Sequence, residues 1–106
     1  MAEFVRVAST DEIPLGQGKL VETDGRFIAV FNVNGEFYAV DDECTHATAS
    51  LSDGFVDGMA VECPLHGAKF DLRTGEALWS PAVIPVACYD VKVEGSDVLV
   101  NPEPRG

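Results

Sequence analysis

The sequence predicts an all-β domain, and three observations support that prediction. First, Asn34-Gly35 lies between 26–33 and 36–40, two runs rich in β-branched and aromatic residues, and this is a strong hairpin signal. Second, an alternating run over 89–93 is followed, after a Gly-containing turn, by the apolar run 98–100. Third, no segment shows the apolar period of an amphipathic helix.

The other elements are shorter and more weakly indicated. Segments 4–7 and 19–22 are candidate strands joined by a loop rich in Pro and Gly, and 10–13 is compatible with one helical turn. Residues 41–82 are broken by four glycines, and Asp57-Gly58 predicts a tight turn between two short apolar pieces. We therefore expect an antiparallel β-sandwich base with a small subdomain, about 41–82, inserted into it.

Length and composition bound the class of protein. The 106 residues fit one domain, expected to span 1–106, and the apolar content of 46% argues against disorder. The N-terminus lacks the apolar region of a secretory signal, and no run approaches membrane-spanning length. We expect a cytoplasmic monomer without a membrane partner. Three cysteines form an odd set, which is poorly suited to a disulfide framework.

The charge is strongly acidic and unevenly distributed. A net charge of −11 excludes nucleic acid as a partner, because nothing would offset phosphate repulsion. Residues 27–68 contain no Lys or Arg but seven acidic residues: Glu36, Asp41, Asp42, Glu43, Asp53, Asp57 and Glu62. Two interpretations remain open: a solvated surface that keeps the protein in solution, or a negative rim that steers a basic partner toward a functional site.

Two short boxes carry the chemistry. They are Cys44-Thr45-His46 and Cys63-Pro64-Leu65-His66, separated by 16 residues, and they hold both histidines and two of the three cysteines. Each box supplies one thiolate and one imidazole, the ligand types of an iron–sulfur centre with a Cys pair on one iron and a His pair on the other. Structural zinc uses the same ligand types, but it commonly pairs Cys with Cys and His with His. A catalytic Cys/His pair would leave half of the pattern unexplained.

The two boxes resemble those of the Rieske family of [2Fe–2S] proteins, whose C-x-H and C-x-x-H motifs match without a gap. The resemblance implies one [2Fe–2S] cluster with Cys44, His46, Cys63 and His66 as its metal ligands. It continues through 63–75 and into Ser80-Pro81-Ala82, which is similar to the proline loop that covers the cluster in this fold. It extends over about 4–100 and implies the Rieske-type fold.

Departures from the respiratory branch of the family predict a low reduction potential. That branch has an extra, disulfide-forming cysteine in each box, where Ala49 and Leu65 stand here. It also has a Ser and a Tyr whose hydroxyls donate to cluster and ligand sulfur, where Ala68 and Phe70 stand here. Without those donors the reduced cluster is less stabilised. We predict a potential near the low end of the Rieske range, about −150 mV.

The resemblance also implies a function. A stand-alone Rieske domain of this size is similar to the ferredoxin component of bacterial aromatic-ring-hydroxylating dioxygenase systems. Such a ferredoxin passes single electrons from a flavin-containing NAD(P)H reductase to a terminal oxygenase, and it is not itself an enzyme. Catalytic residues are therefore not expected. Alternatives are a Rieske-like small subunit of another oxidoreductase, such as nitrite reductase, and a structural-zinc interaction module.

Two residues outside the boxes stay without an assigned role. Cys88 is interpreted as a small apolar filler on the opposite strand face from Tyr89. Trp79 precedes the proline loop and is interpreted either as core or as a contact for a docking partner.

Overall fold

A computed structural model describes residues 3–43, 49–64, 68–79 and 85–105. The all-β prediction is confirmed, because the helical residues of these ranges form only two single turns, η1 (Thr10–Glu12) and η2 (Leu51–Asp53). The strands of these ranges are β1 (Val5–Ser9), β2 (Gly18–Thr23), β3 (Arg26–Val33), β4 (Glu36–Asp41), β5 (Phe55–Asp57), β6 (Ala60–Glu62), β7 (Lys69–Asp71), β8 (Ala77–Trp79), β9 (Cys88–Tyr89), β10 (Val91–Glu94) and β11 (Asp97–Val100). In the part of the chain described, no helix could cross a membrane.

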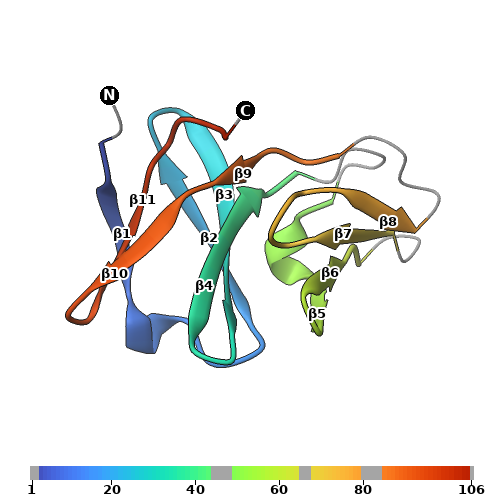
Figure 1. Cartoon of the computed structure of the whole chain (residues 1–106), viewed down its shortest axis with the longest axis horizontal. Coiled ribbons are helices and arrows are strands. Elements are labelled where there is room, and N and C mark those ends of the chain that lie inside the picture. Colours follow the sequence, from blue (N-terminus) through green and yellow to red (C-terminus); the bar gives the residue numbers. More distant parts are fainter. Residues whose placement is uncertain (1–2, 44–48, 65–67, 80–84, 106) are drawn as a thin grey trace.

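The strands form three antiparallel sheets. Their orders are β1-β11-β10, β2-β3-β4-β9 and β5-β6-β7-β8. The first two sheets form the base, and the third stands beside them, next to the end of β4 (Figure 1). The segment inserted between β4 and β9 therefore builds a separate small sheet.

Turn chemistry sets the register of the predicted hairpins. Asn34 and Gly35 both have positive φ, 55° and 89°, which a two-residue hairpin turn with the right twist requires. The turn pairs Val33 with Glu36 and the rest of β3 with β4. The hairpin β10–β11 and the short hairpin β5–β6 around Asp57-Gly58 also agree with the prediction.

The sheet β2-β3-β4-β9 is the shared wall of two apolar cores. Ile28 and Val30 pack toward β1 and β11, whereas Ala29 and Phe31 pack toward the small sheet. Every residue from Ile28 to Val33 is therefore buried. Burial on both faces explains why β3 reads as a continuous apolar run rather than as an alternation of apolar and polar residues.

The run 88–93 is two strands rather than the single one predicted. Cys88 and Tyr89 pair with β4, whereas Val91 to Glu94 pair with β11 in the other sheet. Cys88 and Tyr89 face opposite cores, and both are buried. The apolar filler interpretation of Cys88 fits this burial, but its face does not share the solvent exposure of Asp90.

Candidate metal centre

The base of the first box is held by Asp42, whose side chain is only 7% exposed. Its carboxylate accepts hydrogen bonds from the Ser50 hydroxyl at 2.5 Å and from the Ser52 amide at 2.9 Å. Its main chain donates to the Phe27 carbonyl at 3.1 Å and accepts from the Leu51 amide at 2.6 Å. Asp42, two residues before the first box, therefore connects β3 with the turn that follows the box.

A single β-bridge between Glu43 and Ser50 closes the same loop. Leu51 follows it in η2 and is fully buried against the core on the small-sheet side. Apolar burial on one side and the Asp42 hydrogen bonds on the other fix both ends of the segment that carries the first box.

The second box begins where β6 ends. Cys63 is 1% exposed, and its amide donates to the Ala68 carbonyl at 2.6 Å, which closes the loop just before β7. The Cys63 side chain lies in the same apolar core as Leu51, Ala68 and Phe70. An apolar shell of this kind shields a metal-bound thiolate from water and influences its redox potential.

Of the four predicted ligands, the structure describes Cys63. Cys44, His46 and His66 lie outside the described residues, as does Ser80-Pro81-Ala82 of the predicted proline loop. For this reason the described ranges contain no cluster of three or more metal-binding side chains. What they show is that the bases of both boxes belong to one core.

Ala68 and Phe70 stand where the resemblance indicates hydroxyl donors in the respiratory branch. Both are fully buried, and neither can donate a hydrogen bond from its side chain. This is the setting on which the low-potential prediction rests.

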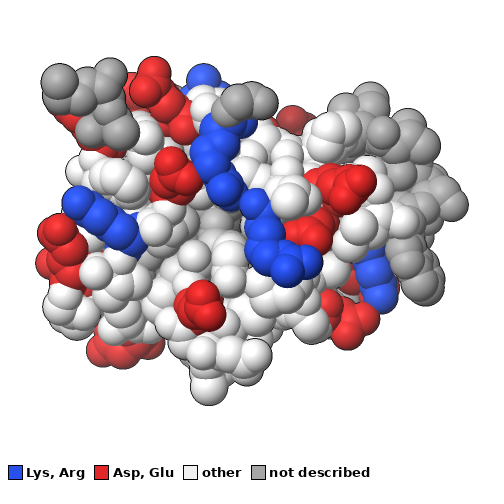
Figure 2. All heavy atoms as spheres, in the orientation of Figure 1, with Lys and Arg blue, Asp and Glu red and all other residues white. Residues whose placement is uncertain are grey.

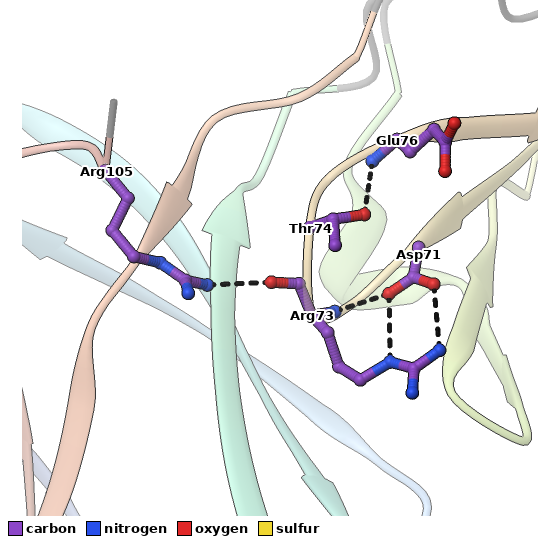
Figure 3. Close-up of polar contacts among 5 residues, drawn as sticks. All are labelled: Asp71, Arg73, Thr74, Glu76 and Arg105. Atoms are coloured by element: carbon purple, nitrogen blue, oxygen red, sulfur yellow. Dashed lines mark hydrogen bonds and ion pairs between the residues drawn. The ribbon is translucent and has the colours of Figure 1, made fainter.

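A tight turn of polar residues follows β7 (Figure 3). Asp71 accepts from the Arg73 amide at 2.7 Å, and its other oxygen lies 3.2 Å from the Arg73 guanidinium. Burial acts to raise the pKa of Asp71, but the hydrogen bonds and charge of Arg73 outweigh it and hold that pKa below its usual value. Arg105 then donates to the Arg73 carbonyl at 2.9 Å, which ties the C-terminal segment to this turn.

Tyr89 supports the other face of β4. It is 1% exposed, and its hydroxyl donates to the carboxylate of Asp41, the last residue of β4. Burial, together with the hydrogen bond and the negative charge of Asp41, raises the pKa of Tyr89 to about 12. Sequence reasoning missed the hydrogen bond between Tyr89 and Asp41 and the burial of Asp42. Asp41 and Asp42 lie in a run of acidic residues, which gives no sign of burial.

The charged surface is not uniformly acidic. On the face drawn in Figure 2, basic side chains gather near the centre and acidic ones lie around them. Lys69 on β7 bonds Asp57 on β5 at 2.8 Å and spans the small sheet; this hydrogen bond lowers the pKa of Asp57. Lys69 and Arg73, the cations near the second box, are each paired with a carboxylate. They therefore do not offset the negative charge of the other acidic residues.

Comparison with known families identifies the fold. Residues 3–90 match the Rieske [2Fe-2S] domain. The chain belongs to this family. A Rieske-type [2Fe–2S] cluster is its cofactor, and the buried thiol of Cys63 at the base of a closed loop fits that assignment.

Relatives of this Rieske protein include ferredoxin subunits. It is 46% identical over 99 residues to the biphenyl dioxygenase ferredoxin subunit of Pseudomonas sp. strain KKS102, covering 92% of this chain and 91% of that protein. It is 48% identical over 91 residues to the 3-phenylpropionate/cinnamic acid dioxygenase ferredoxin subunit of Shigella boydii serotype 4 strain Sb227, covering 85% of each.

Solved structures agree. The ferredoxin of carbazole 1,9a-dioxygenase from Nocardioides aromaticivorans IC177 superposes with a TM-score of 0.91 at 38% identity, covering 96% of this chain and all of that one. A chain from the complex of reduced oxygenase and oxidised ferredoxin in carbazole 1,9a-dioxygenase gives a TM-score of 0.89 at 36% identity, covering 96% and 95%.

Proposed function

We propose that this Rieske protein is the ferredoxin of a multicomponent aromatic-ring dioxygenase. It accepts one electron at a time from a flavin-containing NAD(P)H reductase and delivers it to the terminal oxygenase. The observation that carries the proposal is the near full-length similarity to ferredoxin subunits of such systems, 46% over 92% of the chain. The protein is then an electron carrier of the cytoplasm, where reducing conditions suit thiolate ligands.

We further propose the ligand set. Cys44 and Cys63 hold one iron, and His46 and His66 hold the other. Support comes from the two boxes and from the burial of Cys63 in the core that also receives Leu51 and Ala68, the residues at the bases of the two loops. Such a centre supplies one-electron chemistry. We propose a single domain, 1–106, with the ligand subdomain at about 41–82. Its role is to position the two loops that carry the ligands.

The chain's own residues set the conditions for electron transfer. Cys63 is buried in a core that keeps water from its side chain, and the Asp42 network connects the segments on either side of the first box. We expect a metal site held in this way to change its structure little on reduction, so that electron transfer requires little rearrangement of the protein. The fully buried Ala68 and Phe70 place no side-chain hydroxyl near the second box, which keeps the potential low.

The alternative functions receive less support. A putative nitrite reductase small subunit superposes with a TM-score of 0.81 but is only 25% identical, well below the ferredoxin subunits. A structural-zinc module does not fit a chain of the Rieske [2Fe-2S] family.

Iron and sulfide analysis with absorption and electron paramagnetic resonance spectra tests the ligand set. Cys63→Ser and His66→Ala should lose or alter the Rieske spectrum. Cys88→Ser is the matched control, because Cys88 is also buried but lies outside both boxes, and its spectrum should be unchanged. An unchanged spectrum in His66→Ala would refute the proposed ligands.

A reconstituted electron-transfer chain tests the function. Purified protein is mixed with a ferredoxin reductase and NADH, and then with ring-hydroxylating terminal oxygenases and their aromatic substrates. We expect product formation that depends on this ferredoxin with at least one oxygenase. Reduction by the reductase without product from any oxygenase would refute the proposal.

A further inference from the structure

The segment 101–105 lies along one edge of the base. Strand β9 is the last strand of its sheet and has β4 on one side only. The Asn101 amide donates to the Asp90 carbonyl at 2.9 Å, and the Arg105 amide donates to the Cys88 carbonyl at 2.8 Å. The segment therefore follows the edge of β9 that β4 leaves free.

The Arg105 side chain reaches from this edge to the ligand subdomain (Figure 3). Its Nη2 atom donates to the main-chain carbonyl of Arg73 at 2.9 Å, and its Nε atom lies 3.3 Å from the Asp90 carboxylate. A guanidinium is a planar fork that can hold two acceptors at once. One side chain therefore joins the base to the turn that follows β7.

That turn and the second box lie at opposite ends of one hairpin. All three residues of β6 pair with β7, and the second box lies in their connection, 63–68. At the other end of the hairpin, the Leu72 amide donates to the Met59 carbonyl at 2.8 Å, and Arg73 follows directly. A shift of the turn is therefore transmitted along the paired strands to the box.

The same turn has a second attachment. The Val86 amide donates to the Gly75 carbonyl at 2.9 Å. Val61 and Phe70 also pack the hairpin into the core, but hydrophobic contact has no preferred direction. With the Val86 bond alone, the hairpin could still rotate about that point. The bond from Arg105 holds the turn two residues away, and two points of attachment fix a direction.

We propose that Arg105 is a positioning residue, which sets the direction in which the β6–β7 hairpin and the second box extend from the base. The proposal goes beyond the electron-carrier function and does not depend on the partners of the protein. The fork of the guanidinium matters more than its charge, because the acceptor at Arg73 is a neutral carbonyl.

Hydrogen exchange followed by mass spectrometry tests the attachment. Arg105→Ala should exchange about five- to tenfold faster in 60–64 and 72–76, as expected for the loss of one hydrogen bond, and less than twofold faster in the β2–β3 hairpin. Arg105→Lys should behave in the same way, because an ammonium group keeps the charge but lacks the fork.

Lys92→Ala is the matched control. The side chains of Lys92 and Arg105 are both 46% exposed, and each lies 3.3 Å from a carboxylate. The partner of Lys92 is Glu94 on its own strand, so its loss removes a similar ion pair without touching the ligand subdomain. Exchange in 60–64 and 72–76 should match wild type in this variant.

Electron paramagnetic resonance of the reduced protein tests positioning separately from stability. A hairpin that extends in more than one direction gives the cluster more than one environment, so the lines should broaden in Arg105→Ala and Arg105→Lys but not in Lys92→Ala. A residue that only stabilises the fold would leave the line shape unchanged.

Three results would each overturn the proposal. They are an equal rise in exchange in the β2–β3 hairpin, wild-type protection in Arg105→Lys, and line shapes in Arg105→Ala that match those of Lys92→Ala. None of these bears on the proposed function, which fails only if the wild-type chain delivers no electrons to an oxygenase.

Discussion

Replacing Asp42 with Asn tests whether one buried carboxylate fixes the first box. The amide oxygen can still accept from the Ser52 amide, but the negative charge is lost, and an amide NH₂ group then faces the Ser50 hydroxyl. A hydrogen bond to a charged group contributes about 1.5–3 kcal/mol. At roughly 4 °C per kcal/mol for a domain of this size, the thermal midpoint should fall by about 6–12 °C.

The assay compares thermal midpoint and iron release in Asp42→Asn with those in Asp90→Asn. Asp90 also carries a carboxylate, but it is exposed and pairs with Arg105 at 3.3 Å, so its loss should cost less than about 1 kcal/mol. We expect faster iron release to a chelator only in Asp42→Asn, since only that variant loosens the segment before Cys44. Equal midpoints and equal release rates in the two variants would show that the Asp42 network does not hold the box.

Three further outcomes are expected. Phe70→Tyr should raise the reduction potential by about 60 mV, because a hydrogen bond of roughly 1.4 kcal/mol to the reduced site corresponds to that shift for one electron. Electrochemistry that shows no rise would contradict the low-potential argument. Tyr89 has its pKa raised from 10.0 to about 12, so its contribution, roughly 2–3 kcal/mol, is complete below pH 10 and is lost as the pH rises through 12. Alkaline unfolding curves of Tyr89→Phe should lack that loss, and a curve parallel to wild type would count against it. Gly75 has a φ of 78°, and a Cβ there would meet the Val86 carbonyl, so Gly75→Ala should lower the free energy of unfolding in denaturant melts by more than about 2 kcal/mol. Gly95 has a φ of 62° and open space around it, so Gly95→Ala should lower it by only about 1 kcal/mol. Equal losses in the two variants would be inconsistent with the close approach at Gly75.

Local signals in the sequence were sufficient for much of the fold. The hairpin at Asn34-Gly35 depends on backbone conformations that few residue pairs adopt, so it could be predicted from two residues. The strands Lys69–Asp71 and Ala77–Trp79 were not predicted, because three-residue strands carry no measurable period. The division of 88–93 between two sheets was missed, since alternation along a strand does not reveal which sheet it joins.

The sequence predicted the type of metal cluster but not the hydrogen bonds of Asp42 that hold the segments around the first box. The ligand boxes are recognisable because the ligand types and short spacings are fixed by the metal. Asp42 was one of seven acids for which the sequence left a solvated surface and a steering rim open, and its burial was not predicted, because its partners Ser50 and Ser52 lie 8 and 10 residues further along the chain. Long-range partners of this kind leave no periodic signal.

The position of β1 has a practical consequence. This strand forms an edge of the base and lies across the molecule from the small sheet (Figure 1). A linker attached at the N-terminal side would anchor the protein to a bead with the small sheet, whose strand β6 leads into Cys63, on the side away from the bead. The fold therefore suits an immobilisation that leaves the small sheet accessible to dissolved partners.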